Sequence, residues 1–145
     1  MNRSDATAKL LISGANCAQS VLCTFVDELG LDIEQAMRAA TQFGGGMAAS
    51  GQTCGAVTAA LIALGAKHGT STPAETKQSK YDAYRLGQEF IRRFLDRKNA
   101  LTCGEILGCS ISTPEAYAEA QAKNLFVTKC LKPMKDAVEI LEQML

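Results

Sequence analysis

The chain lacks tryptophan, has one histidine and carries no excess of charge of either sign. Its 145 residues include 15 basic and 15 acidic side chains, so the formal net charge is zero. Nucleic-acid binding and polybasic membrane anchoring both need a clustered surplus of Lys and Arg, and the balanced charge argues against both. The longest uncharged, largely apolar run, residues 55–66, falls short of the roughly 20 residues that cross a bilayer. We therefore expect no nucleic-acid partner and no membrane partner.

A signal peptide is also missing near the N-terminus. The apolar stretch that begins at Leu10 is interrupted by Ser13, Gly14 and Asn16, whereas a signal peptide needs a continuous apolar segment of roughly 7–15 residues. We therefore expect a cytoplasmic protein with reduced thiols. The six cysteines, which would allow 15 pairings, then point to metal binding, redox exchange or burial rather than to a disulfide framework.

The composition predicts helices. Alanine occurs 22 times among 145 residues, and runs of Val, Ile and Thr are few. Capping residues, glycine and proline divide the chain into a short helix that stops near residue 14, and into segments at 17–29, 33–43, 53–67, 72–99, 103–107, 114 onward and 131–145. The segment 53–67 is apolar nearly all round, which predicts the central helix. We predict an all-α, single-domain (residues 1–145), compact bundle of about six to seven helices.

Two helices carry apolar stripes. In segment 72–99 the stripe comprises Tyr84, Ile91, Phe94 and Leu95. In the last segment apolar residues recur at spacings of three and four, which fits either intramolecular core or a homo-oligomer contact.

Three cysteines directly follow residues typical of helix N-caps. The pairs are Asn16-Cys17, Thr53-Cys54 and Thr102-Cys103. In the first turn of a helix, unsatisfied N–H groups and the helix dipole favour negative charge. We therefore expect the pKa of these thiols to fall below the roughly 8.5 of free cysteine. Burial as a small apolar residue is the alternative for each of them.

The other three cysteines differ from one another. Cys130 lies three residues before Pro133, where the chain enters the last helix, and would complete a set of four. Cys109 follows Cys103 by six residues and is a weaker candidate, as a thiol that resolves a disulfide with Cys103. Cys23 lies on a different helical face from Cys17, which predicts a core position.

Glycines cluster around Cys54. Glycine allows tight turns and close approach to a ligand, so the candidates for contact with a cofactor are Gly44, Gly45, Gly46, Thr53 and Gly55. The alternative is a tight joint between two helices.

Several familiar sites are not indicated. No Cys-x-x-Cys occurs, which argues against a thioredoxin-like motif, a zinc ribbon or a clustered ferredoxin run. The glycine cluster matches neither a P-loop nor a dinucleotide fingerprint. His68 precedes Gly69 at a predicted helix C-terminus, where a cation suits the dipole, and we expect no catalytic role for it.

Three stretches and two single cysteines of the sequence resemble the C_GCAxxG_C_C family of redox-active proteins. They are the segment 16–22 (NCAQSVL), the segment 43–47 (FGGGM), the segment 51–58 (GQTCGAVT) and the single cysteines 103 and 130. The resemblance covers nearly the whole chain and assigns the family's four characteristic cysteines to Cys17, Cys54, Cys103 and Cys130. One departure is Ala59, which stands where the family motif has its last glycine.

The resemblance implies redox or metal chemistry at these four thiols. In one version they exchange disulfides, with Cys54 attacking and a neighbour resolving the mixed disulfide; in another they bind an iron–sulfur cluster. The protein would be an oxidoreductase or an electron-transfer protein, with an unidentified redox partner protein or a small thiol as its partner. The alternative is a module without turnover, either with Zn²⁺ on the same four thiolates or with buried structural cysteines. The cofactor is therefore an iron–sulfur cluster, zinc or none.

Overall fold

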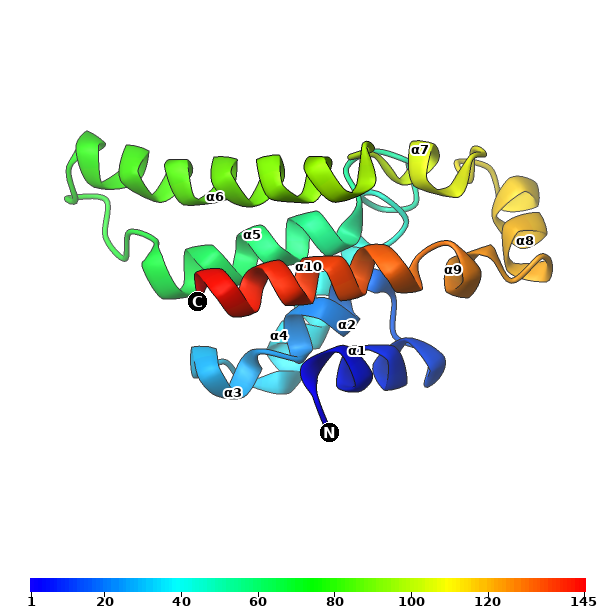
Figure 1. The fold of residues 1–145 in the computed structure, drawn as a ribbon, viewed down its shortest axis with the longest axis horizontal. Coiled ribbons are helices and arrows are strands. Elements are labelled where there is room, and N and C mark those ends of the chain that lie inside the picture. The colour runs from blue at the N-terminus through cyan, green and yellow to red at the C-terminus, as the bar shows by residue number, and fades with distance from the viewer.

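A computed structural model describes all residues from 1 to 145, and its regular elements are helices (Figure 1). The elements are α1 (Arg3–Ile12), α2 (Cys17–Cys23), α3 (Val26–Leu29), α4 (Ile33–Ala40), the 3₁₀ turn η1 (Thr41–Phe43), α5 (Gly55–His68), α6 (Lys77–Lys98), α7 (Cys103–Leu107), α8 (Pro114–Ala122), α9 (Leu125–Thr128) and α10 (Leu131–Met144). α3, α7 and α9 are single turns of four or five residues. The seven longer helices confirm the prediction of an all-α bundle.

α5 is the central helix, as its sequence predicts. Ala56, Val57, Ala59 and Ala60 are fully buried in it. Small side chains let neighbouring helices approach closely, and α2, α6 and α10 pack against α5. Figure 1 shows α6 and α10 running beside α5 on different sides, with α1 below α10. None of the helices has the length and apolar character needed to cross a membrane.

The buried side chains form two separate clusters. The main core of 23 residues is built around α2, α5, α6 and α10. The minor core consists of Cys103, Leu107, Ile111 and Ala120. This division matters below because the cysteines of interest lie on both sides of it.

Two predicted helix boundaries were wrong. The predicted helix 17–29 breaks between α2 and α3, where the Thr24 hydroxyl donates to the Ser20 carbonyl (2.8 Å) and bonds the Thr7 hydroxyl (2.8 Å). α6 begins at Lys77 with Thr76 as its N-cap, not at residue 72. The Glu75 carboxylate instead closes a turn by accepting from the Ser71 backbone N–H.

The buried face of α6 agrees with the predicted stripe at Ile91 and Phe94 and differs from it at Tyr84 and Leu95. Phe90 and Phe94 are fully buried, with ring centroids 6.1 Å apart, whereas Tyr84 is 62% exposed. Burying a phenylalanine side chain stabilises the folded state by roughly 1.5–3 kcal/mol. The face of α6 that carries Phe90 and Phe94 therefore packs on the core, and Tyr84 is left exposed.

Candidate functional site

Cys17 is the first residue of α2, and the cap that precedes it is fixed on both sides. The Asn16 side chain accepts from the Gln19 N–H (2.9 Å), and the Gln19 side chain accepts from the Asn16 N–H (2.9 Å), which completes the predicted capping box. The Asn16 amide also donates to the Thr41 carbonyl (3.1 Å), and the Gln19 amide donates to the Met37 carbonyl (3.0 Å). These bonds tie the start of α2 to the end of α4.

Cys54 and Cys103 are brought together by two short extended segments. Thr53 and Thr102 form an isolated antiparallel bridge, and the Cys54 N–H donates to the Leu101 carbonyl (2.8 Å). The Cys103 N–H in turn donates to the Gln52 carbonyl (2.6 Å). In such a pairing, residues 54 and 103 lie diagonally on the same face.

The bridge changes the predicted capping at Cys54. Thr53 is not the N-cap of α5; Cys54 itself is, and it makes no side-chain capping hydrogen bond. Cys130 has the same position at the start of α10. Cys17 and Cys103 occupy the first helical position of α2 and α7, and Thr102 caps α7 by accepting from the Glu105 N–H. All four thiols therefore lie at helix N-termini.

Two glycines allow this close approach. A Cβ on Gly55 would lie 2.5 Å from the Cys17 Sγ and 2.8 Å from the Phe43 carbonyl oxygen. A Cβ on Gly46 would lie 2.5 Å from the Cβ of Cys103. Both contacts are too short for any side chain, so the two glycines are packed directly against the thiol residues.

A left-handed turn joins η1 to the bridge. Its φ angles are 63° at Gly45, 70° at Gly46, 67° at Met47, 54° at Ala48 and 58° at Ala49. Left-handed backbone costs a residue with a side chain roughly 1–2 kcal/mol. Three consecutive non-glycine residues in this conformation are local strain beside the thiols, where strained backbone is typical of a functional site.

The four thiols are near enough to one another to interact electrostatically. Burial raises the pKa of Cys54 from 9.0 to about 12, and the neighbouring thiols of Cys17 and Cys103 add to the rise. Burial likewise raises the pKa of Cys103 to about 11, again with a contribution from Cys17. The pKa of Cys130 is raised by burial and then by Cys17, Cys54 and Cys103. Burial is thus the main cause of the raised pKa at each of these three thiols.

These shifts overturn the predicted lowering of the thiol pKa values. Removal from water disfavours the thiolate more than the N–H groups at the helix ends favour it. Cys17 has the largest set of opposing contacts: burial raises its pKa above the ordinary value, and the backbone N–H groups of Gly45, Ala18 and Gly55 offset only part of that rise. Cys17 is therefore the thiol whose charged form has the most hydrogen-bond donors.

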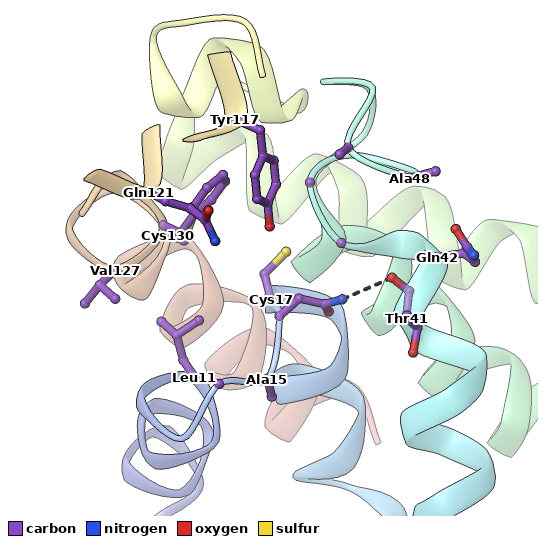
Figure 2. Close-up of a pocket in the computed structure, with 16 residues that line it drawn as sticks. Leu11, Ala15, Cys17, Thr41, Gln42, Ala48, Tyr117, Gln121, Val127 and Cys130 are labelled. Atoms are coloured by element: carbon purple, nitrogen blue, oxygen red, sulfur yellow. Dashed lines mark hydrogen bonds between the residues drawn. The ribbon is translucent and has the colours of Figure 1, made fainter. Parts of the chain in front are cut away.

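A pocket of about 500 Å³ opens beside Cys17 (Figure 2). Cys17 and Cys130 line it, whereas Cys54 and Cys103, at 7% and 6% exposure, do not. Figure 2 shows the Cys17 sulfur pointing into the pocket and the Tyr117 hydroxyl pointing in from the opposite wall. A small molecule entering this pocket meets Cys17 before the two buried thiols.

Four thiolates are chemically suited to bind a metal centre, since both zinc and iron–sulfur clusters can be held by four cysteine ligands. However, no three His, Cys, Asp or Glu side chains are arranged here to hold a metal ion. All six cysteines are free thiols. The thiols as they are arranged here therefore do not converge on one metal-binding point.

A comparison with known protein families identifies the family of this chain. The family described as "Putative redox-active protein (C_GCAxxG_C_C)" matches residues 15–144. The chain belongs to this family. No curated protein and no solved structure matches it.

Three residues that do not follow the C_GCAxxG_C_C motif have clear places in the structure. Ala59, which replaces the last motif glycine, is fully buried in α5 and is accommodated there without a break in the helix. Cys23 is buried in the main core, as predicted. Cys109 is exposed in the loop after α7, within electrostatic reach of Cys103.

The glycine cluster has two roles in this C_GCAxxG_C_C protein. Gly44 and Gly45 line the pocket. Gly46 and Gly55 pack against thiol residues, and Thr53 forms the bridge; none of these three lines the pocket. Contact of the five residues with a cofactor stays a prediction.

Some site features escape sequence analysis. Tyr117 and Phe126 line the pocket as an aromatic pair with centroids 5.0 Å apart, but they lie about a hundred residues from Cys17 along the chain. The left-handed conformation of Met47, Ala48 and Ala49 is also unexpected, because residues with a side chain rarely adopt it and the only sequence signal is the pair of glycines that precedes them.

Proposed function

We propose that the protein is a thiol–disulfide redox protein that works through Cys17, Cys54, Cys103 and Cys130. The observation that carries the proposal is the placement of four free thiols around one pocket: Cys17 and Cys130 line it, Gly55 holds Cys54 next to the Cys17 sulfur, and the Thr53–Thr102 bridge holds Cys103 beside Cys54. Membership of a family described as redox-active supports it.

Cys17 is the attacking thiol in this proposal. It lines the pocket, and its charged form is favoured by the most backbone N–H groups. The sequence suggested Cys54 for this role, but Cys54 is 7% exposed and lies outside the pocket lining. Access therefore favours Cys17.

The exchange takes two steps. The Cys17 thiolate attacks one sulfur of a substrate disulfide, forms a mixed disulfide and releases a thiolate that takes up a proton. The Cys54 thiolate then attacks the Cys17 sulfur, forms the Cys17–Cys54 disulfide and releases the second substrate thiol. Two protein thiols are oxidised and one substrate disulfide is reduced to two thiols. Cys54 is the resolving thiol because Gly55, its neighbour in sequence, contacts the Cys17 sulfur.

The test is disulfide mapping of protein prepared without oxygen. Reduced protein is treated with bis(2-hydroxyethyl) disulfide, quenched, alkylated and analysed by peptide mass spectrometry, with metal content measured on the same sample. We expect a Cys17–Cys54 disulfide that dithiothreitol reverses. Cys17→Ala should abolish it, whereas Cys23→Ala, a change at a buried thiol elsewhere in the core, should leave it intact.

Two results would overturn the proposal. An unchanged thiol count would leave the cysteines as buried structural residues. One equivalent of zinc, or iron with sulfide, that protects all four thiols from alkylation would assign the site to a metal centre instead.

A further inference from the structure

The pocket beside Cys17 contains no charged side chain. None of its 16 lining residues is Asp, Glu, Lys, Arg or His, although 21% of the chain is charged. The volume of about 500 Å³ lies within the range of small-molecule sites. The pocket is therefore large enough for a small organic molecule and has no ion pair to offer one.

The lining instead combines apolar contacts with neutral polar groups. Tyr117 and Phe126 supply an aromatic pair to the lining. Leu11 and Val127 add aliphatic surface (Figure 2). Gln121 supplies an amide that donates and accepts hydrogen bonds. These groups suit a ligand with short aliphatic arms and neutral polar ends.

An ionised ligand would be disfavoured here whatever its sign. A carboxylate or an ammonium group that leaves water without an opposite charge loses several kcal/mol of solvation. The lining offers no Lys, Arg or His side chain to an anion and no Asp or Glu side chain to a cation. We therefore expect the pocket to bind neutral ligands in preference to ligands of either charge.

We propose that this pocket is the substrate site and that it takes an uncharged, low-molecular-weight disulfide, which Cys17 attacks. The inference rests on the proposed function, because it names the substrate class for the same thiols. It excludes small disulfides whose arms carry carboxylates or ammonium groups.

The test uses three symmetrical disulfides of similar size and different charge. They are bis(2-hydroxyethyl) disulfide, which is neutral, cystamine, which is dicationic, and dithiodiglycolate, which is dianionic. The rate of Cys17 oxidation is followed by quenched peptide mass spectrometry for native protein and for protein unfolded in urea. The ratio of the native to the unfolded rate removes the intrinsic reactivity of each probe.

We expect the ratio for the neutral probe to exceed both other ratios by at least about tenfold, the effect of an unpaired charge leaving water. Long-range attraction by the protein's charge would instead accelerate one charged probe and slow the other. Rejection of both signs is therefore specific to an uncharged pocket.

Two variants that add the same positive charge inside and outside the pocket test the inference further. Gln121→Lys places a cation in the lining and should raise the ratio for dithiodiglycolate several-fold. Gln78→Lys adds the same charge at the start of α6, outside the pocket, and should not.

The possible failures differ between the two proposals. Equal ratios for the three probes, or a charged probe faster than the neutral one, would overturn the pocket inference and leave thiol–disulfide exchange standing. Native protein in which no probe oxidises Cys17 would overturn both.

Discussion

Gly55 shows how much a single methyl group matters at this site. Its Cα faces the Cys17 sulfur and the Phe43 carbonyl oxygen, which leave no space for a Cβ. Gly55→Ala should therefore push α2 and α5 apart and lower the free energy of unfolding by about 1–3 kcal/mol, as overpacking does. Urea denaturation followed by circular dichroism measures this change.

Gly65 is the matched control, since it lies in the same helix. A Cβ there meets nothing within 4 Å, and Gly65→Ala should stabilise the protein by up to about 1 kcal/mol through helix propensity. If both variants shift the midpoint in the same direction, the contact with Cys17 is not what constrains position 55.

The buried thiols also predict how stability depends on pH. The pKa of Cys54 is about 12 in the folded protein and 9.0 when the thiol is not perturbed. Above pH 9 the unfolded chain loses this proton while the folded chain keeps it. The stabilisation is therefore complete below pH 9 and is lost as the pH rises towards 12, at about 1.4 kcal/mol per pH unit for one such thiol.

The measurement is urea denaturation of reduced protein between pH 8 and pH 10.5. Cys54→Ala should flatten the decline relative to the wild type, whereas Cys109→Ser, which removes an exposed thiol, should not. A decline of equal slope in Cys54→Ala and the wild type would show that the Cys54 thiol is not the group responsible.

At the scale of elements, the left-handed turn 45–49 is the most strained segment near the site. Ala48 is exposed and has a φ of 54°. Ala48→Gly should therefore stabilise the protein by about 1 kcal/mol, because glycine adopts this conformation without steric cost.

The same substitution in a helix should have the opposite sign. Ala66 is exposed in α5, and Ala66→Gly should destabilise the protein by about 0.5–1 kcal/mol. Thermal or urea denaturation of the two variants measures both effects. Destabilisation by Ala48→Gly would mean that the methyl group contributes more than the backbone strain costs.

Elements with local signals are the ones that the sequence predicts well. Asn16 and Thr102 cap the helices they were expected to cap, because a cap depends on residues only three positions apart. The start of α6 and the break after Cys23 depend on side-chain bonds of Glu75 and Thr24, which compete with helix and leave no periodic pattern.

At the scale of the whole molecule, the proposed disulfide would join α2 to α5. It would close a loop of 38 residues, from Cys17 to Cys54. Restricting the unfolded chain in this way stabilises the folded state by up to about 4 kcal/mol. The oxidised protein should therefore unfold at a higher urea concentration than the reduced protein.

The comparison needs a variant that cannot form this link. In Cys54→Ser, oxidising and reducing conditions should give the same midpoint. A wild-type protein that is less stable when oxidised would indicate that the cross-link distorts the packing of α2 on α5.

The site itself was only partly predictable at this scale. The four cysteines could be selected by their places near helix starts and by the family resemblance. Their pKa values could not, because burial depends on α7–α10 closing over Cys103 and Cys130. The pocket could not be predicted from the sequence either, since its walls come from three segments that are far apart in the chain, residues 11–17, 41–49 and 117–130.

The two hydrophobic clusters divide the four thiols in a way that bears on motion. Cys54 belongs to the main core and Cys17 packs against it, while Cys103 belongs to the minor core and Cys130 packs against that. Because a cluster of four buried residues should open at a lower free energy than one of 23, we expect amide hydrogens of α7 and α8 to exchange with solvent before those of α5. Such partial opening would expose Cys103 while Cys17 and Cys54 stay in place, and we expect its frequency to limit how fast an external oxidant reaches Cys103.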